Sequence, residues 1–106
     1  MISEQDIERA IDFLRDNAEV AAKNRAERLY LEDYTRSLKA QIMAEHLAEP
    51  LGAQERHAYA DTRYLNHLAA MKIAIYEDER GRFLRAAAEA KIEAWRTQQA
   101  NMRVNV

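Results

Sequence analysis

A single turn signal divides the chain. The segment Glu49-Pro50-Leu51-Gly52 contains the only proline and one of the two glycines among 106 residues. Proline cannot continue the hydrogen-bond ladder of a preceding helix, and glycine adopts left-handed backbone conformations at little steric cost. We therefore expect a turn at residues 49–52, with the rest of the chain organised around it.

On both sides of this turn the sequence is helix-forming. Ser3, with Asp6 three residues later, is a variant of the capping box and predicts a helix over about 4–48. A short helix is expected over about 53–60 and a last helix over about 63–101. The apolar stripe of the first helix changes face, which leaves open whether that helix is continuous through 23–28. The pattern predicts one all-α domain, a long antiparallel helical hairpin with a short helix at its turn.

The two ends of the chain carry opposite charge. Residues 1–22 contain six acidic and two basic side chains, and residues 80–106 contain six basic and two acidic ones. An antiparallel hairpin would place the acidic start beside the basic end, so the two ends could neutralise each other within one chain. This arrangement also suits the helix dipoles. In the same register, Trp95 would lie near residues 16–18.

Apolar residues lie on two sides of the last helix in its second half. A helix that is apolar on two sides is buried by two neighbours, and a two-helix hairpin of this length buries little surface by itself. We therefore predict a homo-oligomer whose interface lies at the end of the hairpin away from the turn. The residues predicted to form this interface are Ile7, Ile11, Leu14, Leu84, Ile92, Trp95 and Met102.

The sequence does not indicate catalysis or metal binding. None of His46, His57 and His67 has a glutamate three residues before it, and two glycines cannot build a phosphate-binding loop. The histidines are expected to be surface or packing residues, and the acidic run 77–79 is expected to be a solvated face. We expect no enzyme activity, no metal, no cofactor and no small-molecule substrate.

The chain has no cysteine and no apolar run that approaches the length of a bilayer span. Its first residues also lack the pattern of a secretory signal. We therefore expect a soluble protein of the cytoplasm that has no membrane partner.

Basic residues recur at helical spacing and indicate two alternatives. On the first helix, Arg28, Arg36 and Lys39 fall within about a quarter turn of one another, as Arg25 does. On the last helix, Arg85, Arg96 and Arg103 align. Aligned cations can follow a phosphate backbone while aromatic side chains stack on unpaired bases. They can equally solubilise the helices and pair with acids, the alternative that the residues alone favour.

Three segments resemble small helical proteins encoded by tailed phages and prophages. They are 27–40 with its Tyr30-Leu31-Glu32 motif, 54–60, and 91–101 with its Trp95-Arg96-Thr97 motif. That group is similar in size and helical plan to UvsY-type recombination mediators, which bind single-stranded DNA as ring-like oligomers and help to load a recombinase. The resemblance implies phosphate contacts at Arg28, Arg36, Lys39, Lys91 and Arg96.

The sequence thus leads to two hypotheses of function. The first is a phage-encoded, non-enzymatic mediator that binds single-stranded DNA without sequence preference and cooperates with a recombinase or a single-strand-binding protein. The alternative is a homo-oligomeric scaffold that binds a phage or host protein and no nucleic acid.

Overall fold

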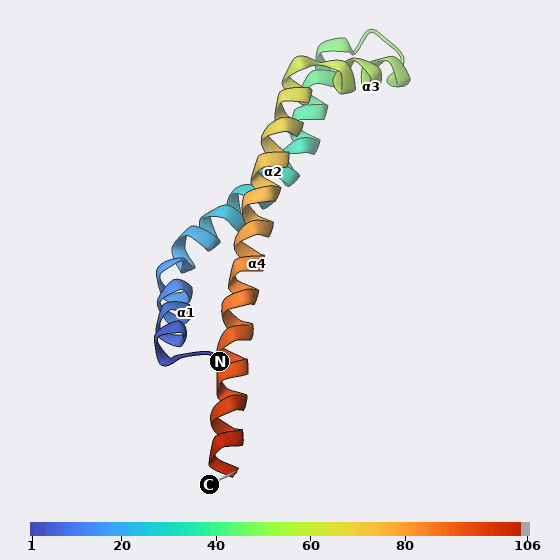
Figure 1. The fold of residues 1–106 in the computed structure, drawn as a ribbon. Coiled ribbons are helices and arrows are strands. Elements are labelled where there is room, and N and C mark those ends of the chain that lie inside the picture. Colours follow the sequence, from blue (N-terminus) through green and yellow to red (C-terminus); the bar gives the residue numbers. More distant parts are fainter. Residues whose placement is uncertain (105–106) are drawn as a thin grey trace. The chain divides into compact units, whose positions relative to one another are not determined.

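The computed structural model describes residues 1–104, and all regular structure in this part of the chain is helical (Figure 1). The prediction of an all-α protein is confirmed. The elements in order are α1 (Glu4–Asp16), α2 (Ala18–Met43), the 3-10 helix η1 (Ala44–His46), α3 (Leu51–Ala60) and α4 (Thr62–Val104).

The first helix begins at the predicted cap. The Ser3 hydroxyl accepts a hydrogen bond from the Asp6 backbone N–H at 3.1 Å, and the Asp6 carboxylate accepts one from the Ser3 N–H at 3.0 Å. These two bonds form a capping box, and the one that the Ser3 N–H donates to the carboxylate is the main cause that lowers the pKa of Asp6 below its ordinary value.

The helical stretch predicted over 4–48 is divided at Asn17, where α1 ends. Both the backbone N–H and the side-chain amide of Asn17 donate to the Phe13 carbonyl, at 3.0 and 3.1 Å. A side chain that competes for a backbone acceptor in this way perturbs a helix. By contrast, α2 runs through residues 23–28 without a break.

Pro50 starts the short helix that follows the turn. Its backbone is extended (φ −58°, ψ 154°), and its carbonyl accepts from the N–H groups of Ala53 and Gln54, so α3 begins at Leu51 rather than at residue 53. Neither glycine has a positive φ, and Gly52 lies inside α3. The left-handed conformation anticipated at Gly52 is absent, because the fixed φ of Pro50 already suits the start of a helix.

The chain divides into two compact units. Unit 1 contains residues 1–23 and 79–104 of the described chain, and unit 2 contains residues 24–78.

In unit 2, α2 and α4 lie side by side around a small core. Leu38, Ile42 and Ala58 are its buried members, and Ile42 is fully buried. The contacts between α2 and α4 run in antiparallel order, from Arg28 with Asp78 to Thr35 with His67.

Two buried polar groups connect these helices. Asp78 is 5% exposed and lies 3.2 Å from the Arg28 guanidinium, which also pairs with Glu32 at 2.9 Å. The prediction that the acidic run 77–79 is a solvated face was therefore wrong for Asp78, because α2 supplies a cation opposite it. His67 is also buried, with Nε2 2.8 Å from both the Leu31 carbonyl and the Thr35 hydroxyl.

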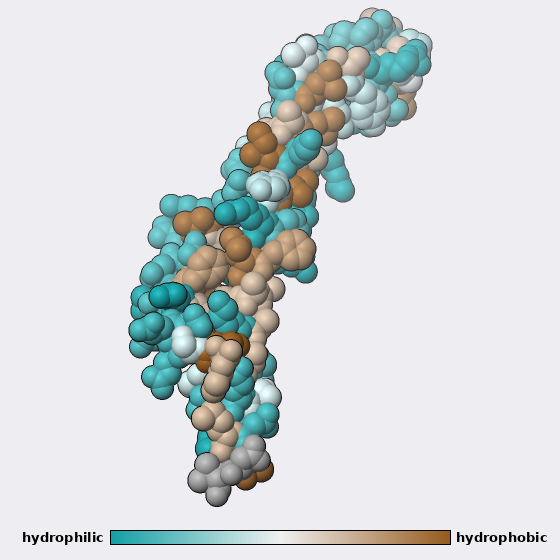
Figure 2. All heavy atoms as spheres, in the orientation of Figure 1, coloured by the Kyte–Doolittle hydropathy of each residue, from teal (hydrophilic) through white to brown (hydrophobic). Residues whose placement is uncertain are grey.

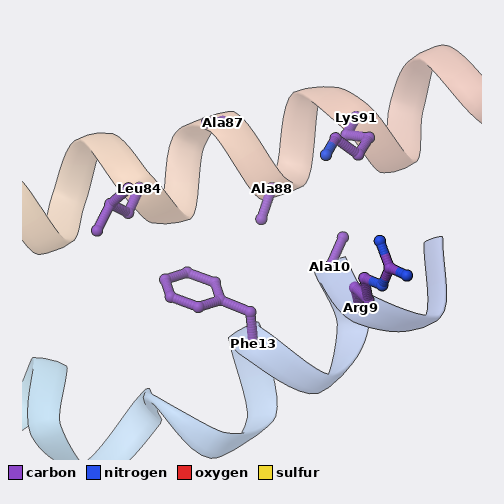
Figure 3. A pocket seen from close by; sticks show the side chains of 7 residues that line it. All are labelled: Arg9, Ala10, Phe13, Leu84, Ala87, Ala88 and Lys91. Atoms are coloured by element: carbon purple, nitrogen blue, oxygen red, sulfur yellow. The ribbon is translucent and has the colours of Figure 1, made fainter. Parts of the chain in front are cut away.

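Unit 1 packs α1 against the later part of α4 mainly through small residues. Ile7, Ala10 and Ala88 are buried, and Phe13 points toward Leu84 and Ala88 (Figure 3). In this register Phe13 fits against a run of alanines. The expected position of Trp95 near residues 16–18 was therefore wrong, because α4 meets the end of α1 at residues 84–88.

Candidate functional site

Large apolar side chains are exposed over much of the chain. Ile42 is the one large side chain in residues 1–104 that is fully buried. Figure 2 shows apolar residues at the surface among charged ones. In unit 1, Phe83 is 70% exposed, and Ile11 and Met102 are each 49% exposed. Exposed apolar residues indicate an interaction surface where they form a contiguous patch, whereas single ones are common on protein surfaces.

All seven residues predicted to form the oligomer interface lie in unit 1. Ile11, Leu84 and Met102 are exposed, and Leu14, Ile92 and Trp95 are half-buried. Ile7 is only 6% exposed and packs within its own chain, so it is not accessible to a partner. Phe83 was missed, although it directly precedes Leu84.

A groove with a volume of about 240 Å³ lies between α1 and α4 of unit 1 (Figure 3). Its apolar lining comes from Ala10, Phe13, Leu84, Ala87 and Ala88, and Arg9 and Lys91 complete it. The groove thus combines an apolar floor with two cations.

Charges in unit 1 pair locally. Arg15 pairs with Asp12 and Asp16 on α1, and Arg96 pairs with Glu93 on α4. Within residues 1–104, no ion pair connects 1–22 with 80–104. The pKa of Asp6 is lowered mainly by the bonds from Ser3 and only slightly by Lys91. The predicted neutralisation of the acidic start by the basic end is therefore not made through ion pairs.

The residues proposed to contact phosphates are divided between the units. Unit 2 contains Arg28, Arg36 and Lys39, and unit 1 contains the other four, which are Arg85, Lys91, Arg96 and Arg103. Arg28 is held by Asp78 and Glu32, and Arg96 pairs with Glu93. Of the remaining five residues, Lys39 pairs with Glu55, and the other four make no ion pair within the described residues. Three of the seven cations thus pair with acids of the same chain, and four make no ion pair within the described residues.

Lys39 interacts mainly with an aromatic residue of α3. Its Nζ donates to the Tyr59 hydroxyl at 2.8 Å and lies 4.7 Å from the centre of that ring, with Glu55 at 4.0 Å. The hydrogen bond to Tyr59 is the largest cause of a raised Lys39 pKa. At about 100° per residue, Tyr30 lies half a turn away from Lys39 on α2, so that exposed ring and this cation face different sides.

The three histidines occupy two settings. His67 joins α2 to α4, whereas His46 and His57 come together beside Glu49 at the start of α3. The sequence analysis missed this convergence, although His46 and Glu49 are three residues apart and Pro50 returns the chain toward them.

Within residues 1–104, no helix has the length and apolar character needed to cross a membrane. No protein-family model, curated protein or solved structure matches the chain.

Proposed function

We propose that the protein is a non-enzymatic helical module whose unit 1 binds a second copy of the same chain. The observation that carries this proposal is the imbalance of burial in unit 1. Its buried apolar residues in the described chain are Ile7, Ala10 and Ala88, whereas Phe83 and Leu84 remain exposed. Transferring one such large side chain from water into an interface contributes about 1.5–3 kcal/mol, so the exposed residues can support association.

Charge favours a second copy as the occupant of this surface. The acidic side chains of residues 1–22 and the basic ones of residues 80–104 make no ion pairs with each other inside the chain. In a two-fold symmetric dimer, the acidic segment of each copy meets the basic segment of the other. The acidic and basic segments then face each other at two places in the dimer.

The groove between α1 and α4 supplies the apolar part of this contact. Phe83 is exposed on the same unit, and its ring is the side chain that we place in the groove of the second copy. The long antiparallel hairpin predicted from the sequence would then be one half of a larger helical bundle. A scaffold of this kind presents its remaining helical faces to a protein partner.

Analytical ultracentrifugation over a range of protein concentrations tests the proposal. The wild-type chain is expected to be a dimer or larger at micromolar concentration, and the double variant Phe83→Glu/Leu84→Glu is expected to be a folded monomer. The matched control is Leu65→Glu/Ile73→Glu, which changes two exposed apolar residues of α4 in unit 2 and is expected to leave association unchanged. A wild-type monomer at high micromolar concentration would contradict the proposal.

We infer a second candidate function, the binding of single-stranded DNA, from two exposed cations of α2. Arg25 and Arg36 make no ion pair within the described residues, and eleven positions along a helix place them on nearly the same side. Self-association would present several such weak sites together and so raise the total affinity. The resemblance to UvsY-type mediators supports this candidate.

Fluorescence anisotropy with a labelled single-stranded oligonucleotide separates the two functions. Binding that weakens steeply with salt is expected if phosphate contacts contribute, and Arg25→Glu/Arg36→Glu is expected to abolish it. The control Lys72→Glu/Arg80→Glu changes the net charge equally at other exposed positions of α4. Equal loss in both variants would show a charge effect without a defined surface, and an oligomer that binds no DNA at low salt would leave the scaffold function alone.

A further inference from the structure

The turn before α3 brings two imidazoles and a carboxylate to one point. His46 ends η1, Glu49 directly precedes Pro50, and His57 lies in α3. Nε2 of His57 is 2.7 Å from Oε2 of Glu49, and Nδ1 of His46 is 3.7 Å from the same oxygen. One ligand atom from each residue lies within 4.8 Å of the other two.

Two hydrogen bonds to the backbone of the turn hold this arrangement. The Glu49 N–H donates to the His46 carbonyl at 3.0 Å, which closes the turn. The Gln54 side-chain amide donates to the Glu49 carbonyl at 2.8 Å, which fixes the same residue to the start of α3. The His46 and His57 rings are then stacked with their centres 4.0 Å apart and their planes 3° apart. The three side chains are therefore placed together by the fold of the turn.

We propose that His46, Glu49 and His57 bind a divalent transition-metal ion, with Zn²⁺ as the ion of choice. Zinc binds imidazole nitrogen and carboxylate oxygen at about 2.0–2.2 Å, which puts the donor atoms of a tetrahedral site about 3.3 Å apart. The 2.7 and 3.7 Å separations lie on either side of this value, and the two stacked rings must tilt out of their parallel arrangement for both nitrogens to face one ion. Mg²⁺ and Ca²⁺ prefer oxygen ligands and fit a site with two imidazoles poorly.

Two nearby carboxylates are engaged elsewhere. Arg63 lies 2.8 Å from Glu45 and 3.0 Å from Asp61, and both acids have their pKa lowered by hydrogen bonds from this guanidinium. The ligand set of the chain is therefore the two histidines and Glu49. Their side chains are 32–45% exposed, so water can complete the coordination. Three protein ligands with one open position are typical of zinc sites that exchange a ligand.

The ion would link η1, the turn and the second turn of α3 in unit 2. Coordination needs an unprotonated Nδ1 at His46 and an unprotonated Nε2 at His57, so metal and protons compete for both rings. All three ligand residues belong to unit 2, and the inference does not depend on self-association. A metal that binds only the folded arrangement also stabilises it.

Calorimetric titration of the untagged protein with Zn²⁺ tests this site. The wild-type chain is expected to bind one ion, and each of His46→Gln, His57→Gln and Glu49→Gln is expected to weaken binding by about tenfold or more, since a ligand matters at least as much as its supporting residues. Glu45→Gln is the matched control, because it changes a neighbouring acid that Arg63 holds. Its affinity is expected to stay within about twofold of wild type, as its carboxylate is no ligand.

Nitrogen-detected NMR of the imidazole rings in the wild-type protein gives a second readout that needs no variant. On addition of Zn²⁺, Nδ1 of His46 and Nε2 of His57 are expected to shift, whereas both nitrogens of the buried His67 stay in place. Absence of binding at millimolar Zn²⁺ would overturn the proposal. So would equal affinity in the His46→Gln/His57→Gln variant, or a shift confined to other nitrogens.

Discussion

Unit 2 and unit 1 each hold two helical segments together, but they do so with different side chains. In unit 2, hydrogen bonds and an ion pair connect α2 to α4, and a fully buried Ile42 lies at the core. In unit 1, alanines and Phe13 make the contact, and Arg15 and Arg96 each pair with acids of their own helix. Unit 2 thus contains polar contacts that fix its own register, whereas unit 1 leaves apolar surface unused.

Ion pairs and alanine contacts differ in how strongly they depend on the register of the two helices. An ion pair such as Arg28 with Asp78 is satisfied in one register, because a shift by one turn leaves a buried charge alone. Contacts between alanines change little after the same shift, since every turn of α4 in residues 86–94 offers a similar surface. Two helices that meet through alanines are held in one register more firmly when another helix packs against them, which agrees with the proposed self-association of unit 1.

The largest effect is expected from breaking the buried pair of unit 2. Asp78→Ala removes a buried carboxylate that connects α4 to the Arg28 guanidinium of α2 and should lower the free energy of unfolding by about 3 kcal/mol. The corresponding change in unit 1, Glu93→Ala, removes an exposed partner of Arg96 and should cost less than about 0.5 kcal/mol. Urea denaturation of both variants at one protein concentration measures the two values. Equal effects would remove the distinction drawn between the units.

A smaller effect, with the opposite sign, is expected from filling the groove of unit 1. Ala87→Leu adds apolar atoms between α1 and α4, next to Phe13, and should raise the free energy of unfolding by about 1 kcal/mol. The same side chain occupies the space proposed for the second copy, so association should weaken as stability rises. Urea denaturation and ultracentrifugation of this variant measure the two properties. A variant that associates more tightly would place the contact between copies elsewhere.

The helices of this protein follow from the sequence, because Pro50 is the main breaker and the capping residues Ser3 and Asp6 are local signals. The register of the helices does not follow, since apolar residues repeat every three or four positions and a shift by one turn buries a similar area. The burial of Asp78 depends on which residue of α2 lies opposite it, so no local pattern could reveal it. The end of α1 at Asn17 is also hard to anticipate, because asparagine is common within helices as well as at their ends.

Of the two candidate sites, one was predicted in part from the sequence and the other was not. The exposed apolar surface of unit 1 was predicted in part, since Ile11, Leu84 and Met102 follow from the helical period. The meeting of His46 with His57 was not predicted, because it depends on the extended backbone of Pro50, which turns α3 back toward η1. A contact between residues that are eleven positions apart can be predicted only when the path of the turn is known.

The smallest expected effect concerns the capping box at the start of unit 1, and it depends on pH. Hydrogen bonds from Ser3 lower the pKa of Asp6 below its ordinary value of 3.8, so the folded chain binds the proton more weakly than the unfolded chain. The contribution of the carboxylate is therefore complete above the ordinary pKa and is lost as the pH falls through the lowered one. Asp6→Asn keeps the shape of the side chain without its charge and should lower the thermal midpoint by about 3 °C at pH 7. Circular dichroism should show the two midpoints converging as the pH falls below the lowered pKa, where the wild-type carboxylate is protonated as well. A difference that persists at low pH would assign the effect to packing, and unit 1 would then gain nothing from the charge at its first turn.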